Sequence, residues 1–552
     1  MSLITLRTAG AIMIASITTL SSAAENVQKV ETNCVAEVAC VSSKAYKNPF
    51  TEVALDAVVT GPDRAQIRVP AFWAGGNRWA FRFASDSPGT YTWTLDCSDT
   101  GNAALHGVAG KIEVTAYRGE NPLYRHGPVR VAKNRRHFEH ADGTPFFWLA
   151  DTWWKCLCKR MTWEGFQQLT ADRKAKGFTV VQIVCGPYPD ESFLDKRIEN
   201  EGGMPYETRD FTVVNPKYFD YVDRRIQHMV DAGISPAIVG AWGRSDCDSM
   251  KAIGVEGLKR HWRYLVARYG AYPVFWILAG EIPDGTKWGE GPWAEVAKYL
   301  RGIDPYHRLL TCHTGSGRRG ADGDANVIDY DMVGGNHDER VAVEAKTLAI
   351  LTAAYAKDPP MPVLVGETCY EGHMQQGFGD VQRHIFWMNM LSGAAGHTYG
   401  TAGVWHAGVE GDPGHTGAWG APYDFTTWKE GMNYPGSAQL ALGKRLLEKY
   451  RWWQFEPHSE WAPGCLAAGI PGEVRFVYLP RRNIYNWDGP EVKDLDADVD
   501  WHVFYFDPAT GRTFDQGVIK ATAKDKKAPA VTFKKNVPSP QDWVLVFKRV
   551  TQ

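Results

Sequence analysis

The sequence predicts an α/β protein in which a (β/α)8 TIM barrel is flanked by an N-terminal and a C-terminal β-sandwich domain. A chain of 552 residues is too long for one ordinary domain, so two or three are expected. The middle of the chain alternates strand-like and helix-like segments, whereas both ends contain mainly strand-like runs. Two central runs, PVFWILAGE (273–281) and PVLVGE (362–367), are almost wholly apolar and end in Gly-Glu. Such runs are typical of parallel strands covered on both faces.

The overall composition gives no sign of a nucleic-acid or anionic membrane partner. The 61 basic and 63 acidic residues leave a net charge of −2, and 44% of the residues are hydrophobic, enough for full-sized cores. The chain contains 22 Trp, 23 Tyr and 23 Phe. Core packing is the more common role of any one Trp, but so many aromatic rings also suit stacking on the apolar faces of sugars.

Residues 1–24 have the pattern of a signal peptide. Arg7 supplies a weakly positive start, an apolar stretch follows over 9–20, and small residues at 22–24 precede the expected cleavage site. No later run reaches the ~20 apolar residues of a membrane-spanning helix. We therefore expect a periplasmic or secreted protein without a membrane span.

Ten cysteines would then meet an oxidising compartment, in which disulfides persist. Cys34 and Cys40 could close a small loop. Others fall near predicted strand ends, where some could pair across the barrel mouth; these are Cys156, Cys158, Cys185, Cys247, Cys312 and Cys369. The pairing cannot be deduced from the sequence. A Cys-His zinc site is disfavoured because no Cys-x-x-Cys motif occurs.

Residues 28–118 predict the first sandwich. The runs TEVALDAVV, AQIRVPAFW, RWAFRFAS, GTYTWTLDC and GKIEVTAY alternate apolar and polar residues with the period of half-buried strands. Turn residues at 75–77 and 87–89 separate some of these runs. Several short strands at this spacing indicate a sandwich.

Residues 135–450 predict the barrel. Strands are expected at 146–150, 178–185, 234–242, 273–281, 307–313, 327–333, 362–367 and 393–400, most of them followed by a helical pattern. Thr162 and Asn215-Pro216 read as helix starts, and Gly177 and Gly233 as helix ends. Eight units over about 300 residues is the usual size of a (β/α)8 barrel. A doubly wound sheet would instead need a Gly-rich phosphate turn after the first strand, where this chain has 151–154, DTWW.

Residues 452–552 return to strand-like runs, EVRFVYLP, WHVFYFDPATGRTF and DWVLVFKRV, with a turn at 507–511. They predict a small C-terminal sandwich. No free-standing linker separates either sandwich from the barrel, so we expect both to pack on it.

Glu281 and Glu367 are the candidate catalytic residues. Each follows a predicted buried parallel strand, at the end where barrel enzymes place their acid and base groups.

Other polar and aromatic residues near predicted strand ends are candidates for substrate binding: Asp151, Trp153, Trp242, His313, His337, His397, Tyr399 and Trp405. Asp151 could instead cap a loop, and a lone histidine is often a structural donor. Gln182 is expected to be a satisfied core amide, and Tyr370 and Glu371 to have scaffold roles. The loop 405–427 could form a lid or an ordered surface excursion.

The motifs of the barrel resemble those of the apiosidase-like (DUF4038) family of glycoside hydrolases. The matching pieces occur in order: FFWLADTWW, LAGE, VGETCYEG, GAAGHTYGTAGVW and WKEGMNYPGSAQL. NPF and VPAFWAGGNRWAFRFASDSPGTYTWTL resemble the DUF5060-type sandwich that precedes such barrels. WWQFEP, VYLP and FDPATG resemble the collagen-binding-like domain that follows them. The resemblance covers nearly all of the mature chain.

The resemblance implies an exported glycoside hydrolase that acts on a plant or algal polysaccharide or oligosaccharide and needs no cofactor or metal. Similarity to retaining barrel glycosidases assigns Glu281 as acid/base and Glu367 as nucleophile, with carboxyl groups ~5–5.5 Å apart. One residue departs from that pattern. Many such enzymes carry Asn directly before the fourth-strand acid, where it contacts the sugar 2-hydroxyl, whereas this chain has Gly280. Either another donor serves, or the subsite differs.

Two other classes of function stay open. The first is a non-catalytic barrel that binds carbohydrate or protein, although paired strand-end glutamates argue against it. The second is a metal-dependent hydrolase that uses His313, His337, Asp331 and Asp338. The oligomeric state is left open by the sequence.

Overall fold

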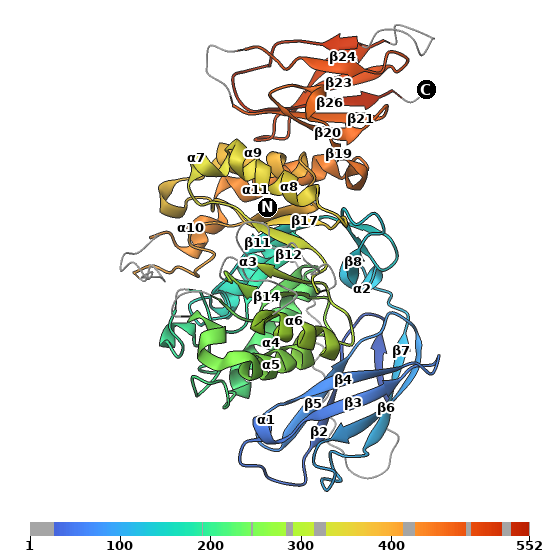
Figure 1. Ribbon diagram of the computed structural model, residues 1–552, viewed down its shortest axis with the longest axis vertical. Coiled ribbons are helices and arrows are strands. Elements are labelled where there is room, and N and C mark those ends of the chain that lie inside the picture. Colours follow the sequence, from blue (N-terminus) through green and yellow to red (C-terminus); the bar gives the residue numbers. More distant parts are fainter. Residues whose placement is uncertain are drawn as a thin grey trace, which may run out of the picture.

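A computed structural model describes residues 27–189, 191–243, 247–282, 291–313, 327–411, 425–481, 487–520 and 531–550. The signal peptide predicted at 1–24 lies outside the described residues. The molecule is elongated, with an α/β region in the middle and strand-rich regions at both ends (Figure 1). The described part of the chain contains no helix that is both long and apolar enough to cross a membrane.

The N-terminal region is a seven-stranded sheet in the order β1-β7-β6-β3-β4-β5-β2. Its strands are β1 (Val27–Glu31), β2 (Ala36–Val41), β3 (Leu55–Thr60), β4 (Gln66–Trp73), β5 (Arg78–Phe83), β6 (Gly89–Cys97) and β7 (Ala109–Thr115), with the short helix α1 (Pro49–Glu52) between β2 and β3. The first part of β4 pairs with β3 and its last part with β5. The sheet thereby folds over and encloses a core that includes Val59, Phe81 and Trp93.

Short elements lead into the α/β region: α2 (Pro122–Arg125), β8 (Val129–Val131), β9 (Phe138–His140) and β10 (Pro145–Phe146). Eight parallel strands follow: β11 (Trp148–Thr152), β12 (Val180–Val184), β13 (Ser235–Val239), β14 (Phe275–Gly280), β15 (Leu310–His313), β16 (Asp331–Gly334), β17 (Val363–Glu367) and β18 (Gly396–Tyr399). Each overlaps one of the predicted strands.

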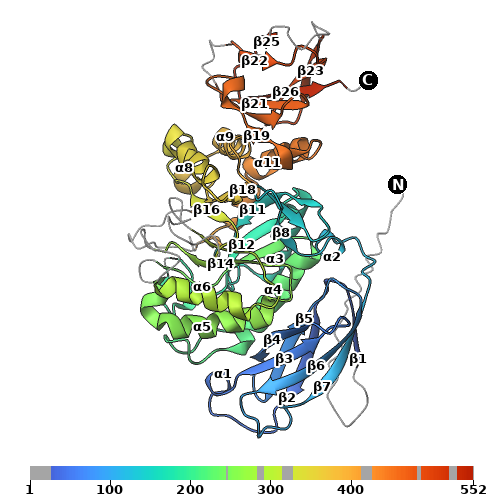
Figure 2. The same ribbon diagram turned by 45° about the vertical axis from the view of Figure 1, so that its right-hand side comes forward.

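Six of these strands form one sheet, in the order β15-β14-β13-β12-β11-β18, and β16 and β17 form a second. Two backbone hydrogen bonds join the sheets at both edges: Asp329 N–H donates to Leu310 O at 2.8 Å, and Ala395 N–H donates to Val363 O at 2.8 Å. The helices lie outside the strands (Figure 2). They are α3 (Trp163–Ala175), α4 (Pro216–Asp231), α5 (Ser249–Tyr269), α6 (Pro292–Ile303), α7 (Glu339–Ala342), α8 (Ala345–Tyr355), α9 (Gly379–Met390), α10 (Trp428–Met432) and α11 (Pro435–Leu447).

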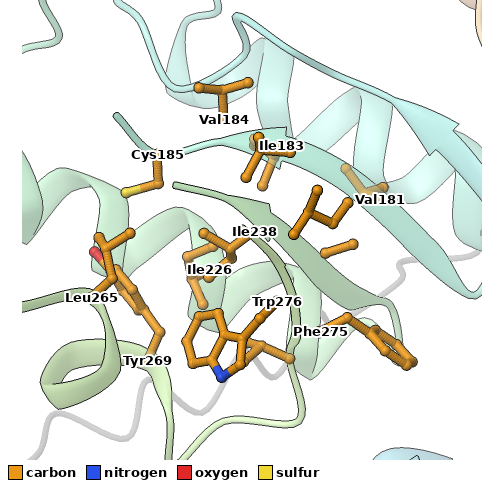
Figure 3. Packing of buried hydrophobic residues seen from close by; sticks show 14 of the residues in the cluster. Val181, Ile183, Val184, Cys185, Ile226, Ile238, Leu265, Tyr269, Phe275 and Trp276 are labelled. Atoms are coloured by element: carbon orange, nitrogen blue, oxygen red, sulfur yellow. The ribbon is translucent and has the colours of Figure 1, made fainter. Parts of the chain in front are cut away.

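The strands are apolar along most of their length because helices cover their outer side and other strands lie across the interior. Figure 3 shows side chains on the outer face of β12, β13 and β14 (Val181, Ile183, Ile238 and Trp276) gathered with side chains of α4 and α5 (Ile226, Leu265 and Tyr269). Phe275, next to Trp276, points to the opposite face and packs on Trp148. Helix α4 begins where the sequence predicts, because the Asn215 side chain accepts from Lys217 N–H and Pro216 occupies the first turn.

The C-terminal region contains a six-stranded antiparallel sheet, β19-β20-β21-β26-β23-β24, and a two-stranded sheet, β22-β25. The strands are β19 (Glu456–Pro457), β20 (Leu466–Ile470), β21 (Val474–Leu479), β22 (Val492–Leu495), β23 (Trp501–Phe506), β24 (Thr513–Ile519), β25 (Val531–Phe533) and β26 (Trp543–Arg549). Trp387 of α9 and Phe476 of β21 belong to one apolar cluster. Arg383 of α9 donates to both Asp542 oxygens, at 2.8 and 2.7 Å. These contacts confirm the predicted packing at this end.

A buried charge network joins the N-terminal sheet to the α/β region. Arg82 of β5 donates to the Asp223 carboxylate at 2.5 Å and to Arg268 O at 2.7 Å. Arg268 of α5 donates to the same Asp223 carboxylate at 2.8 Å. The N-terminal sheet therefore packs directly on α4 and α5, as predicted.

Replacing Asp223 by Ala is expected to lower the stability by about 3–5 kcal/mol, because two buried guanidinium groups lose their shared carboxylate. The loss should appear as an earlier midpoint in thermal or urea unfolding. Glu256→Ala, at an exposed position of the same interface helix α5, is the control and should change the midpoint little. Equal midpoints for the two variants would contradict the role given to Asp223.

The predicted disulfides are not formed. Cys34 and Cys40 are free thiols, and so are Cys156, Cys158, Cys185 and Cys369 near the strand ends. The Cys312 thiol donates to the backbone oxygen of Ala279 at 3.0 Å. Burial raises the pKa of the Cys40 and Cys369 thiols to about 12, so these groups stay protonated. The cysteines of the α/β region are all buried, as is common for small side chains of this kind.

Candidate active site

Both candidate glutamates follow a shift in strand register. Between Ile277 and Gly280, β14 advances three residues while β15 advances two, so β14 contains one extra residue. Val365 and Glu367 of β17 pair with the consecutive residues Val333 and Gly334 of β16, so β17 also contains one extra residue. An extra residue of this kind re-aims the side chains beside it. Glu281 also has a left-handed backbone, with φ of 45°, which non-glycine residues rarely adopt.

Three side chains surround the Glu367 carboxylate. The Tyr370 hydroxyl donates to Oε1 at 2.5 Å, and His337 Nε2 lies 3.2 Å from the same oxygen. His313 Nε2 lies 3.4 Å from Oε2. The Trp154 indole N–H donates to the Tyr370 hydroxyl at 3.0 Å and so fixes the phenol in place.

These neighbours determine the ionisation of Glu367. Burial by itself would raise its pKa, but the hydrogen bond from His337, the charge on His313 and His337 and the bond from Tyr370 lower the pKa to about 2. The carboxyl group is therefore ionised throughout the neutral range. An ionised carboxylate with fixed donors suits a nucleophile, whereas a general acid has to carry a proton.

The Glu281 carboxylate lies against Trp242, whose indole N–H donates to Oε2 at 3.1 Å. This arrangement depends on Gly280. A Cβ atom at position 280 would lie 2.1 Å from a ring carbon of Trp242, closer than any real contact. The indole therefore occupies the space that a side chain at position 280 would fill. This explains physically why glycine, rather than asparagine, precedes the fourth-strand glutamate.

His313 contacts both glutamates. Its backbone oxygen accepts from the Glu281 N–H at 3.0 Å, and its ring lies against the Glu367 carboxylate. The Trp154 ring lies 5.0 Å from the His313 ring and 5.7 Å from that of Trp242. The two carboxylates thus share one wall of packed rings at the carboxyl ends of β14, β15 and β17.

Four residues predicted to bind substrate lie instead on the outer side of their strands. Asp151 pairs with Tyr399 in the ladder between β11 and β18, so their side chains share one face, and His397 is on the same face two residues before Tyr399. Trp153 follows β11, and its ring lies 5.5 Å from that of Phe166 on α3. All four are fully buried, at 0% exposure. The Asp151 carboxylate accepts from Arg173 of α3 at 2.6 Å and from Trp153 at 2.7 Å. The sugar contacts predicted for these residues are therefore wrong.

The outer face of β18 serves as a scaffold. The Tyr399 hydroxyl donates to Glu371 at 2.5 Å, and Glu371 also accepts from Gly436 N–H. His397 lies 3.1 Å from the side-chain amide of Asn389 on α9, and burial lowers its pKa to about 3. The scaffold role expected of Glu371 is confirmed. Gln182 is a buried amide, but only its donor side is satisfied as expected: Nε2 donates across the interior to Gly366 O at 2.8 Å, whereas Oε1 has no hydrogen-bond partner within the described residues.

The other predicted residues, Trp242, His313, His337 and Trp405, lie at the site. The Trp405 ring is 6.4 Å from the Tyr370 ring and 6.0 Å from that of His373. The structure adds two residues that sequence reasoning missed. Tyr370 was expected to have a scaffold role, but it contacts the carboxylate of Glu367. Trp154 was not among the candidates, which included its neighbour Trp153 instead. Side chains alternate between the two faces of a strand, and Trp154 lies an even number of residues from Trp148. The Trp148 ring points into the interior, 4.8 Å from that of Phe275. This alternation is the signal that could have found Trp154.

The rival metal site is not assembled. Among the described residues, no three His, Cys, Asp or Glu side chains gather in a way that could hold an ion. Asp338 instead caps α7 by accepting from Arg340 N–H at 3.0 Å. The predicted lid, 405–427, is described only in part, because residues 412–424 lie outside the described ranges.

Comparison with known families gives two matches. Residues 132–454, more than half of the chain, match the family model "Apiosidase-like, catalytic domain". Residues 29–98 match the model of a domain of unknown function, DUF5060. A search of curated protein sequences found no match.

Solved structures share the fold. One from Bacteroides vulgatus ATCC 8482, provisionally assigned as a glycoside hydrolase, is 18% identical with a TM-score of 0.70, over 95% of this chain and 100% of that chain. A family 5 glycoside hydrolase from the same organism is 20% identical with a TM-score of 0.61, over 78% of this chain and 95% of that chain. A further structure named "Glycoside hydrolase" is 20% identical with a TM-score of 0.61, over 79% and 99%.

Proposed function

The chain belongs to the family of apiosidase-like catalytic domains and is a glycoside hydrolase, and on this premise we propose that it cleaves glycosidic bonds with retention of configuration. Glu367 is the nucleophile and Glu281 the acid/base. The observation that carries the proposal is the setting of Glu367, whose carboxylate is kept ionised by Tyr370, His337 and His313.

In the first step, a Glu367 oxygen attacks the anomeric carbon while Glu281 gives its proton to the departing glycosidic oxygen. A covalent glycosyl ester forms and the aglycone leaves. In the second step, the Glu281 carboxylate takes a proton from water, and that water attacks the anomeric carbon and frees Glu367. His337, His313 and Tyr370 hold the carboxylate in place throughout, and Trp242 orients Glu281 through its N–H.

We also propose that the eight parallel strands close as a (β/α)8 barrel, spanning about 135–450 between sandwiches at 28–118 and 452–552. The two backbone bonds that join the sheets at β15 and β18 support closure. The substrate proposed is a plant or algal polysaccharide, and the predicted signal peptide would export the protein to reach it.

The proposed function is tested with a panel of plant and algal polysaccharides and their oligosaccharides, with the released sugars identified. Proton NMR of the first product formed shows its anomeric configuration before mutarotation. We expect the product to keep the configuration of the bond that is cleaved. An inverted first product would overturn the two-step mechanism, and binding without any hydrolysis would indicate a non-catalytic barrel.

Replacing Tyr370 by Phe is expected to move the acid limb of the kcat/KM pH profile to higher pH. Activity requires ionised Glu367, so it is lost as the pH falls through the pKa of that group, which is about 2 in the wild type. Removing the hydroxyl raises this pKa, by roughly one to two units, because a hydrogen bond to a charged group contributes about 1.5–3 kcal/mol. Tyr399→Phe is the matched control, since that hydroxyl donates at the same 2.5 Å to Glu371 instead. The same shift in both variants would contradict the assignment.

A further inference from the structure

A cleft lies against the N-terminal sheet, at the end of the α/β region opposite Glu281 and Glu367. Its volume is about 480 Å³. The sheet contributes residues 61–63, 65, 67, 83–87 and 91, and the α/β region contributes Pro273, Tyr306 and Arg308, which precede β14 and β15. Glu281 follows the opposite end of β14, and six strand residues span roughly 20 Å. The cleft is therefore separate from the active site.

The walls of the cleft are held in a fixed shape. A Cβ atom at position 89 would lie only 2.5 Å from Pro62 Cγ. Because Gly89 has no side chain, Pro62 can pack against it, and the two turns of the sheet are in contact. The Tyr91 hydroxyl lies 2.6 Å from Ser85 Oγ and bonds to Ser87 O at 2.9 Å. On the other wall, the Tyr306 hydroxyl donates to Arg82 O at 3.0 Å and ties the α/β region to the sheet. A cleft of this kind is preformed.

The lining combines apolar surfaces with a few polar groups. Tyr91, Phe83, Tyr306 and the prolines form the apolar part, and Asp63 and Asp86 lie on the turns. Ligand sites commonly have this composition and a volume of about 300–1,000 Å³. Phe83 and Tyr91 are buried and form the floor, whereas Tyr306, Pro62 and Pro128 are at least partly exposed. The rings of these three offer apolar faces, which complement the C–H faces of a sugar ring, while carboxylates accept hydrogen bonds from its hydroxyl groups.

Arg308 supplies a donor on the α/β wall. It is 8% exposed, and its Nε and Nη2 atoms donate to the backbone oxygens of Gly270 and Ala271, at 3.0 and 3.2 Å. No carboxylate forms an ion pair with its guanidinium group within the described part of the chain. Burial lowers the pKa of Arg308, although the nearby negative charge of Asp304 acts in the opposite direction and raises it. The two backbone oxygens hold the Arg308 guanidinium group in a fixed position beside the cleft but do not neutralise its positive charge. A ligand that offers an oxygen acceptor there would therefore be favoured.

We propose that this cleft is a second, non-catalytic carbohydrate-binding site, in which a short oligosaccharide packs on Tyr306 and the sheet turns and offers a ring, hydroxyl or carboxylate oxygen to Arg308. The proposal builds on the glycoside hydrolase activity, because a site of this kind would hold the polymer that the active site cleaves. The acceptor can belong to a neutral or an acidic sugar.

The test uses the full chain made inactive by Glu281→Ala and Glu367→Ala together, and calorimetric titration with cellotetraose, mannotetraose and tetragalacturonate. Ala65 is exposed and lines the cleft, so Ala65→Trp fills the cleft without disturbing the core. Gln66→Trp places the same side chain on the adjacent exposed residue, outside the cleft, and is the matched control. Arg308→Gln tests the donor itself.

We expect at least one tetrasaccharide to bind the inactive chain, and Ala65→Trp to weaken that binding at least tenfold while Gln66→Trp leaves it unchanged. Preference for tetragalacturonate would identify a carboxylate at Arg308, and preference for the others a neutral oxygen. Binding of none of the three sugars, or binding that Ala65→Trp leaves unchanged, would overturn the proposal. If the wild type hydrolyses nothing but still shows binding sensitive to Ala65→Trp, the cleft stands and the catalytic proposal fails.

Discussion

Glu367→Gln is expected to lower kcat/KM by at least roughly 10⁴-fold, equal to about 5.5 kcal/mol of transition-state stabilisation, with the fold retained. The amide has nearly the same shape but cannot form the covalent glycosyl ester. Glu371→Gln is the matched control: Glu371 is also buried and hydrogen-bonded, but to Tyr399 and Gly436 rather than in the substrate site. That control should lose stability and keep most of its turnover when folded. Equal losses of turnover in both variants would contradict the nucleophile assignment.

The same substitution has a second expected effect, on stability. The pKa of Glu367 falls from its ordinary 4.5 to about 2 in the folded protein. A group with a depressed pKa stabilises the fold above the unfolded pKa, and that contribution is lost as the pH falls toward the folded pKa. The difference is worth about 3 kcal/mol. Unfolding midpoints between pH 5 and pH 2 should therefore fall less steeply for Glu367→Gln than for the wild type.

Glu281→Ala is expected to lower kcat/KM by about 10²–10⁴-fold on natural substrates, because the leaving oxygen departs without a proton. On an aryl glycoside with an acidic phenol the loss should be much smaller, since that leaving group needs no proton. Added azide should speed the second step, because it attacks the glycosyl ester without a general base. The measurement is kcat/KM for a series of leaving groups, with and without azide. A loss that does not depend on the leaving group would contradict the acid/base role.

The sequence predicted the positions of the eight strands and the two glutamates because these rest on local signals. Apolar runs mark the strands, and Gly-Glu marks where two of them end. The sequence did not predict that both glutamates follow a strand with an extra residue, because register depends on the neighbouring strand.

The errors at the site have one cause. Four residues were selected because they lie near strand ends: Asp151, Trp153, His397 and Tyr399. Side chains at a strand end can point either into the interior or outward to the helices. Which face points inward is decided by packing far along the chain, such as the ion pair between Asp151 and Arg173. Tyr370 was misjudged for a similar reason. It follows Glu367 by three residues, and only the path of the turn brings its hydroxyl back to that carboxylate.

The expectation of disulfides, which are not formed, shows a different limit. Cysteine count and expected compartment favour pairing, but neither says how far apart two thiols lie. The cysteines near the strand ends are buried, and some of their thiols bond to backbone oxygens, as Cys312 does to Ala279 and Cys156 to Val404.

The contact between Gly280 and Trp242 restricts how the proposed active site can change during evolution. Many retaining barrels carry asparagine at the place of Gly280, but here Gly280→Asn would drive a side chain into the indole that holds Glu281. The opposite order, loss of Trp242 first, would leave Glu281 without that donor. Either single substitution is therefore expected to impair the enzyme. Related sequences should accordingly carry glycine at position 280 together with tryptophan at position 242, or asparagine at 280 together with another residue at 242.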